Sequence, residues 1–210
     1  IIMKEFGLNV GLLCGVFLFA PLASAASITV DFDHVRDSGF QVGNFIQDGY
    51  SDFVWSNFGV IEPVSLGEPF ETSGYTNGIV SGDSVGFIDS GSTVTRGGDL
   101  FDFSSAYLTS AWRDNVYVLV TGYLNNNASY QDIFYIDSYV PAFIDFEYLG
   151  IDRLTFSSAN GIDAGYGGNG SNVAIDDMVF NISSVPEPSA LILIISGLIG
   201  FLGFKRKRII

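Results

Sequence analysis

Four aspartates, placed as two pairs far apart in the sequence, have the side-chain chemistry that Ca²⁺ prefers. Asp31 lies at the end of the first strand-like run and Asp33 directly follows it, and Asp176 and Asp177 lie inside the last run. Ca²⁺ binds several hard oxygen ligands, and the two ends of a domain tend to lie close together. These residues therefore predict a structural calcium site, and we expect no other cofactor. Adjacent acids face opposite sides of a regular strand, so both could serve only at a β-bulge. The alternative is that the acids keep a strand edge in water.

Three aromatic residues are candidates for ligand binding, because the faces of sugar rings stack on Trp and Tyr side chains. Trp112 ends an apolar run, where its ring can reach a rim, and Tyr166 lies among glycines with no apolar residue beside it. Trp55 follows Phe53 by two positions and shares its side of a strand, which favours a place in the core. Packing is the alternative for all three residues.

Catalytic residues are hard to find in this sequence. Asp145 and Glu147 lie two positions apart and share one strand face, so they offer the carboxylate pair that a glycosidase needs. The Glu-x-Asp-x-x-Glu strand that is usual in jelly-roll glycosidases is absent, and so is a Gly-x-Ser-x-Gly elbow. His34 is the only histidine. We therefore expect no catalytic residues and no enzyme, with the two acids on a solvated strand face.

The charge of the chain limits its partners. The 210 residues carry a formal charge of −14, and residues 26–184 alone hold four arginines against 21 acids, a formal charge of −17. This charge opposes binding to nucleic acid, so we expect no such partner. Cys14, the only cysteine, lies in the apolar N-terminal segment, which leaves residues 26–184 without disulfide or thiolate chemistry.

The elements that must position these residues are β-strands. Nine β-branched and aromatic runs are separated by Gly, Asn, Asp and Ser clusters. The runs cover residues 27–32, 53–61, 79–88, 101–112, 116–124, 133–140, 142–149, 154–158 and 173–182. Asn125 and Asn126 favour a tight turn between two strong runs, and residues 161–172 form a glycine-rich loop. The pattern predicts an all-β chain with a single β-sandwich or jelly-roll domain.

The N-terminus has the pattern of a secretory signal peptide. Lys4 supplies the positive charge, residues 7–21 are almost entirely apolar, and Ala23-Ser24-Ala25 is a small-residue cleavage site. We expect a signal peptide at residues 1–25, cleaved between Ala25 and Ala26.

The C-terminus combines a proline motif, an apolar run and a basic cluster. The motif consists of Val185, Pro186, Glu187, Pro188 and Ser189. The prolines keep it extended and accessible. Residues 190–204 are uncharged and predict a short transmembrane helix, and snorkelling of the flanking cations would let it span the bilayer. The four cations at 205–208 favour the cytoplasmic side. An ordinary single-pass tail anchor is the alternative.

This arrangement resembles the PEP-CTERM sorting signal of Gram-negative bacteria, which an exosortase processes. The resemblance implies a signal peptide at 1–25, a β-sandwich domain at 26–184 and a sorting signal at 185–210. It also implies an inner-membrane anchor that is removed when the protein passes to the outer surface or the extracellular matrix.

The resemblance further suggests what the exported protein does. PEP-CTERM systems accompany exopolysaccharide production, which implies a structural or adhesive protein associated with exopolysaccharide, cell-surface glycan or biofilm. Runs 101–108, 118–123, 151–156 and 174–180 resemble those of uncharacterised exported β-sandwich proteins and, more faintly, of lectin-type jelly rolls. A lectin-like carbohydrate-binding module is therefore the alternative. An envelope polysaccharide hydrolase that uses Asp145 and Glu147 is a third hypothesis.

Overall fold

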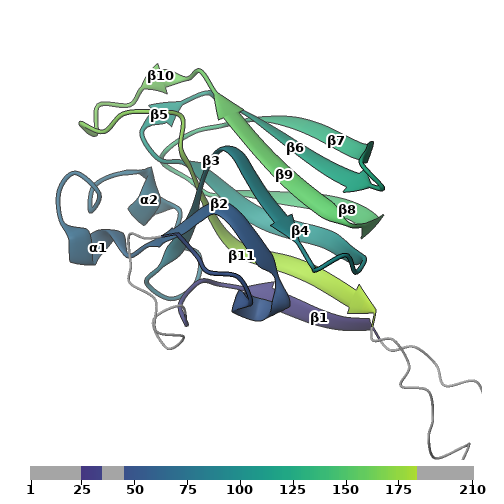
Figure 1. The fold of residues 1–210 in the computed structure, drawn as a ribbon. Helices are drawn as coiled ribbons and strands as arrows, with labels where there is room; N and C mark the ends of the chain where they lie inside the picture. The colour runs from purple at the N-terminus through teal and green to yellow at the C-terminus, as the bar shows by residue number, and fades with distance from the viewer. Residues whose placement is uncertain (1–24, 35–44, 184–210) are drawn as a thin grey trace, which may run out of the picture. The chain divides into compact units, whose positions relative to one another are not determined.

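The computed structural model describes residues 25–34 and 45–183, which form a β-sandwich (Figure 1). The strands in this part are β1 Ala25–Val30, β2 Val54–Ile61, β3 Val85–Thr95, β4 Phe101–Ser110, β5 Arg113–Asp114, β6 Val116–Leu124, β7 Asn127–Ile136, β8 Ala142–Ile151, β9 Arg153–Ala159, β10 Ile162–Asp163 and β11 Val173–Ser183. Two single-turn helices, α1 Pro63–Leu66 and α2 Gly74–Asn77, lie between β2 and β3. The β-sandwich class that the sequence predicts is confirmed.

The two layers of the sandwich belong to one nine-stranded antiparallel sheet that folds over itself. One layer has the strand order β7-β6-β9-β3-β2, and the other has β1-β11-β4-β8. β3 joins the layers, because residues 92–95 pair with β9 while residues 86–88 pair with β11. β5 and β10 form a separate two-stranded sheet. Chain segments far apart in sequence thus become neighbours, and β1 pairs with the C-terminal half of β11.

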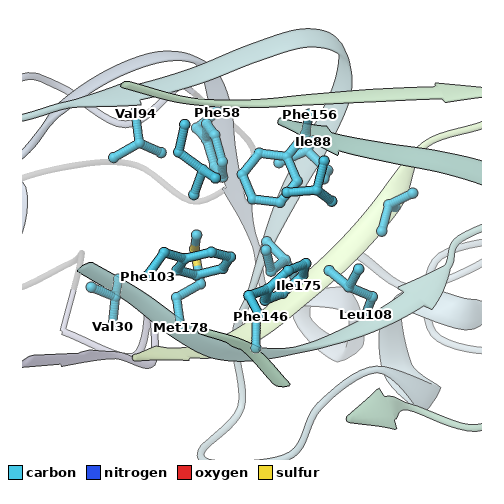
Figure 2. Close-up of a cluster of buried hydrophobic side chains, with 14 of the residues drawn as sticks. Val30, Phe58, Ile88, Val94, Phe103, Leu108, Phe146, Phe156, Ile175 and Met178 are labelled. Atoms are coloured by element: carbon cyan, nitrogen blue, oxygen red, sulfur yellow. The ribbon is translucent and has the colours of Figure 1, made fainter. Parts of the chain in front are cut away.

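The main core fills the space between the two layers (Figure 2). One layer contributes Phe58, Ile88, Val94 and Phe156, and the facing layer contributes residues such as Phe103. All five are at most 1% exposed. Some phenylalanine rings meet nearly at right angles, as in the Phe103–Phe156 pair with ring planes at 84°, and others stack, as in the Phe103–Phe146 pair at 29°. Both arrangements are favoured for aromatic pairs. Strand alternation explains the pattern, since every second residue of each strand points inward.

The starts of β3 and β7 differ most from those predicted, by six residues each. Residues 79–84 precede β3 instead of beginning it, because the backbone N–H groups of Val80 and Ser81 donate to the carboxylate of Asp176 and not to a neighbouring strand. β3 in turn continues to Thr95. β7 begins six residues before the predicted run, at Asn127. The sequence also gave no signal of α1 and α2, whose single turns are too short for a helical period.

The turn between β6 and β7 is the predicted one. Asn125 and Asn126 have φ angles of 52° and 63°, which is the pair of positive values that a type I′ hairpin turn requires. Asn tolerates this conformation better than most residues, so the hairpin register is set locally by the sequence.

Several predictions fall on residues outside those described. They concern the signal peptide at 1–24, the processing motif at 185–189 and the transmembrane sorting helix at 190–204. In residues 25–34 and 45–183, no helix is long and apolar enough to cross a membrane.

Candidate functional site

A pocket of about 780 Å³ opens where the α1–α2 segment and the glycine-rich loop meet the sheet. Figure 1 shows α1 and α2 at the same end of the sandwich as β5 and β10. The pocket is lined by Ile61, Leu66, Pro69, Phe70, Tyr75, Phe87, Trp112, Gly168, Asn169 and Asn172. We call these residues the pocket lining.

The sheet supplies one wall of the pocket. Phe87 and Ala174 are paired across β3 and β11, and both belong to a second apolar cluster that also contains Ile61, Tyr75 and Trp112. Their sequence neighbours Ile88 and Val173 face the main core. Because side chains alternate along a strand, the second cluster lies on the side of β3 and β11 that faces away from the main core.

The α1–α2 segment supplies the second wall. The Ser73 hydroxyl accepts a hydrogen bond from the Tyr75 backbone N–H and caps α2. The backbone N–H of Gly74 donates to the carbonyl of Ala111 at 2.9 Å. A Cβ atom at Gly74 would collide with the carbonyl oxygen of Ser110, so only glycine allows this approach. These contacts fix the Tyr75 ring beside Trp112.

The glycine-rich loop closes the pocket from the third side. Gly168 lies against the indole ring of Trp112, so closely that a Cβ atom there would overlap the ring. The backbone N–H of Ala164 donates to the carbonyl of Trp112 at 3.1 Å. The indole is therefore covered on one face by backbone, and only 5% of Trp112 remains exposed.

Aromatic rings surround Trp112 at steep angles. The ring of Tyr75 lies 5.3 Å away at 87°, and the ring of Phe70 lies 5.4 Å away at 62°. Phe70 is half-buried, so its ring is shared between the cluster and the pocket mouth. These rings present C–H edges and π faces to a bound molecule, which suits the apolar faces of a sugar ring or a methyl group.

All residues of the pocket lining are uncharged, in a domain that is strongly acidic. Asn169, which is exposed, and half-buried Asn172 add amide donors and acceptors at one side. Burial raises the pKa of the Tyr75 hydroxyl, which keeps that group neutral. The pocket thus offers apolar surface and a few neutral hydrogen-bonding groups, and no partner for a charged ligand.

The structure brings two of the three predicted aromatic residues to this site. Trp112 lines the pocket, although as part of its wall and not on an open rim. Tyr166 packs against the second cluster, and its hydroxyl accepts a hydrogen bond from Asn77 Nδ2 at 3.4 Å. The expectation that Tyr166 has nothing to pack on is wrong, because α2 is folded back onto the loop. Trp55 lies in the main core against Phe58, with ring centroids 5.0 Å apart.

The four aspartates of the predicted calcium site bind backbone and hydroxyl donors. Asp176 is fully buried and accepts from the N–H groups of Val80, Ser81 and Asp177, and Asp177 Oδ1 accepts from the Ser81 hydroxyl. A β-bulge, the condition under which both acids could face one site, is present here, with a register shift after Asp176 and φ of 46° at Asp177.

The first pair of aspartates has the same kind of role. Asp33 accepts from the backbone N–H groups of Asp83 and Ser84, and Asp31 accepts from the N–H of Asp33. Within the described residues, no group of three or more His, Cys, Asp or Glu side chains could hold a metal ion. The carboxylates are arranged differently from the predicted calcium site, because each pair accepts hydrogen bonds from part of segment 80–84, which leads into β3.

The remaining predicted residues lie away from the pocket. Asp145 and Glu147 are exposed on the outer side of edge strand β8, as the alternation predicted. Ala25 and Ala26, the predicted cleavage site, begin β1 opposite Ser183 and Ile182. Burial and the charges of Asp31 and Asp33 raise the pKa of Tyr50 to about 12, outside the pocket.

Most of the pocket lining carried no signal in the sequence. Ile61 ends β2, Phe70 and Tyr75 lie in the α1–α2 segment and Phe87 lies in β3. Each of them is as plausible a core residue as its neighbours. The glycines at positions 74 and 168 were the one available hint of the pocket, because no larger residue fits at either position. A glycine in a loop, however, does not reveal which group lies against it.

Comparison with known protein families identifies a sorting motif at the C-terminus. Residues 184–208 match the PEP-CTERM protein-sorting motif, which confirms the resemblance. The chain is an exported protein that is anchored in the membrane by its C-terminus and processed by an exosortase. No curated protein matches the sequence.

Among solved structures, the chain is similar to TmCBM61, whose structure was determined in complex with beta-1,4-galactotriose. The TM-score is 0.33 at 10% sequence identity, over 64% of this chain and 90% of that chain. A likeness this distant says nothing about the ligand of the pocket.

Proposed function

We propose that the exported domain acts at the cell surface or in the extracellular matrix of a Gram-negative bacterium, where it adheres to exopolysaccharide. In this proposal it holds an uncharged sugar residue of the polymer in the pocket. The observation that carries the proposal is the pocket lining, which combines aromatic rings with two asparagines and has no charged side chain. Sorting by the C-terminal motif delivers the domain to a compartment where such polymers occur.

The chemistry of the lining selects the ligand class. An anionic sugar would find no cation in the lining and would be repelled by the acidic domain. A fully apolar ligand would leave the amides of Asn169 and Asn172 without partners, which costs binding energy when these groups are desolvated. A neutral sugar satisfies both conditions, because it has apolar ring faces and hydroxyl groups at its edge.

The proposed role is binding and not catalysis. No acidic residue belongs to the pocket lining, and the carboxylates of Asp145 and Glu147 are on the exposed side of β8. A glycoside hydrolase would need a pair of carboxylates, one on each side of the scissile bond. An assay of sugar release from matrix polysaccharide, with Asp145→Asn and Glu147→Gln as controls, tests this part of the proposal; release that depends on either acid would contradict it.

The binding proposal is tested with the processed protein purified from the producing cells. We expect dose-dependent binding to neutral glycans on an array, weakened about tenfold or more by Phe70→Ala, since truncating an aromatic anchor in a pocket commonly costs this much. Asn169→Ala should weaken binding less. Tyr139→Ala is the matched control, because Tyr139 is aromatic, 62% exposed and outside the pocket lining. Equal losses in Phe70→Ala and Tyr139→Ala, or no glycan binding by the wild type, would contradict the proposal.

The cell-surface part is tested separately. The mature termini, measured by mass spectrometry in cells with and without the exosortase, should differ by loss of the C-terminal tail near Pro188. Identical termini in both strains would show that the tail acts only as an anchor.

A further inference from the structure

The two outer faces of the sandwich differ in charge. The first is formed by the side chains that β6, β7, β9 and residues 92–95 of β3 direct away from the main core. These strands contribute no carboxylate to that side, and we call it the acid-free face. The opposite layer directs Asp102, Asp145 and Glu147 outward. The exposed Asp89 of β3 lies outside residues 92–95 and borders this face, since the hydroxyl of its neighbour Ser90 lies 3.3 Å from that of Ser157 on β9.

A row of neutral hydrogen-bonding side chains crosses the acid-free face. The strand registers place Thr93, Thr155, Thr121 and Gln131 side by side on β3, β9, β6 and β7. Adjacent strands lie about 4.8 Å apart, so the row extends over roughly 14 Å. Gln131 Nε2 donates to the hydroxyl of Thr121, which is 3% exposed, and the Thr93 hydroxyl donates to the Gly91 carbonyl. The Thr155 hydroxyl and the Gln131 carbonyl are left for other partners.

An aromatic and apolar strip runs beside this row. Tyr117 and Tyr135 are paired across β6 and β7, with ring centroids 5.9 Å apart. Tyr135 and Ile133 are 66% and 53% exposed. The one charged side chain on the face is Arg153, whose guanidinium lies over the Tyr123 ring at 4.3 Å. The face therefore offers hydroxyls, an amide and tyrosine rings over several strands.

We propose that the acid-free face docks an extended, uncharged polysaccharide chain. Hydroxyls and amides in a row match a polymer with hydroxyl groups at every unit, and tyrosine rings stack on its sugar faces. A second copy of this domain is disfavoured as the occupant, because two bodies of formal charge −17 would repel each other, and a polyanion meets the same repulsion. An uncharged polymer meets neither obstacle.

This inference rests on the proposed function for the polymer class, but it uses a surface separate from the pocket. A chain that is held at one unit by the pocket and along its length by the acid-free face would be bound at two places. Linking two weak contacts in this way raises the overall affinity strongly. The pocket would select the sugar, and the face would select polymer over short oligosaccharide.

The test is native affinity electrophoresis of the processed protein in gels that contain dextran, amylose, hydroxyethylcellulose or alginate. We expect at least one neutral polymer to slow the wild type, and the double variant Ile133→Ser/Tyr135→Ser to lose about tenfold in affinity. The matched control is Phe143→Ser/Leu149→Ser, whose residues are 56% and 61% exposed on the other edge strand, β8. It should bind as the wild type does.

A second pair of variants tests charge without removing apolar surface. Thr155→Glu should weaken binding to the same polymer, while Thr155→Gln, which is similar in size, should retain it. Melting temperatures of all variants identify any that fail to fold.

Four outcomes would overturn the inference. They are equal binding by the β7 double variant and the wild type, equal losses in the β7 and β8 variants, preference for alginate, and a β7-dependent dimer in sedimentation. If Phe70→Ala abolishes binding while the β7 variant has no effect, the pocket proposal stands and the acid-free face is excluded. A fifth outcome, in which no neutral polymer slows the wild type, would overturn both proposals.

Discussion

The main core and the second apolar cluster, which borders the pocket, are built from the same kinds of residue but differ in how completely they are enclosed. In the main core, the two layers of the sheet meet, and the rings of Phe53, Phe103 and Phe180 between them contact one another and are 0% exposed. In the second apolar cluster, the sheet meets the α1–α2 segment and the glycine-rich loop. The backbone at Gly74 and Gly168 lies there in the place of side chains. A pleated sheet presents side chains at regular spacing, so two sheets interdigitate, whereas loops cannot fill the same volume. The comparison shows how this fold leaves a cavity without weakening its core.

The largest effect is expected in the main core. Phe103→Ala should lower the free energy of unfolding by about 3–5 kcal/mol, because it removes a fully buried ring that contacts Phe146, Phe156 and Phe180. Urea unfolding followed by fluorescence measures the change. A loss below about 1 kcal/mol would mean that the main core relaxes into the space left by the Phe103 ring. The main core would then not be more closely packed than the surroundings of the pocket.

An added methyl group at the pocket wall should have the next largest effect. Gly74→Ala places a Cβ atom against the carbonyl of Ser110, and we expect a loss of about 1–3 kcal/mol together with weaker glycan binding. Thr72→Ala, on the exposed side of the same segment, serves as the control. If Gly74→Ala keeps both stability and binding, the α1–α2 segment is not held as closely as the structure indicates.

Asp176 connects the two regions and should make stability depend on pH. Burial raises its pKa from 3.8 to about 7, against the three backbone N–H groups that favour the charged form. The folded state therefore binds this proton more tightly than the unfolded state does. The contribution of Asp176 is most favourable below pH 4 and is lost as the pH rises from 4 to 7.

The variant Asp176→Asn isolates this contribution. It keeps one acceptor oxygen for Val80 and Ser81 but has no charge to bury. We expect the wild type to lose about 1–2 kcal/mol relative to the variant between pH 4 and pH 7, measured by urea unfolding at each pH. Parallel stability curves for the two proteins would show that the carboxylate is charged throughout this range.

The smallest effect on stability is expected at the mouth of the pocket. Phe70→Ala should cost about 1 kcal/mol, since the ring is half-buried and leaves a space already continuous with the pocket. A loss comparable to that of Phe103→Ala would show that Phe70 belongs to the folding core. Weaker glycan binding by Phe70→Ala could then result from unfolding, and the Asn169→Ala variant would have to test the pocket in its place.

Much of the fold could be predicted because its signals are local. Each of the nine predicted runs overlaps a strand, and the Asn125–Asn126 turn has the conformation that its residues favour. The errors occur where a distant group competes for the backbone. Val80 and Ser81 have the composition of a strand start, but the carboxylate of Asp176 takes their N–H groups.

Less of the candidate site could be predicted. The residues Trp112 and Tyr166 were found because they stand at the end of a run and in a glycine-rich loop. Their surroundings were not found, since Phe70 and Phe87 reach Trp112 or its neighbours only through pairing of β3 with β11 and folding of the α1–α2 segment. Likewise, two of the acids that suggested calcium, Asp176 and Asp177, lie at a β-bulge, and the Ser81 N–H that donates to Asp176 is 95 residues away in the sequence.

The sequence by itself determined the strands, the hairpin turn, the acidic charge and the sorting motif, because each depends on residues within one short stretch. The tertiary structure alone decided where the pocket opens and which strands form the acid-free face. Both properties depend on strand registers that join distant segments, and a register becomes fixed only when the two layers pack against each other.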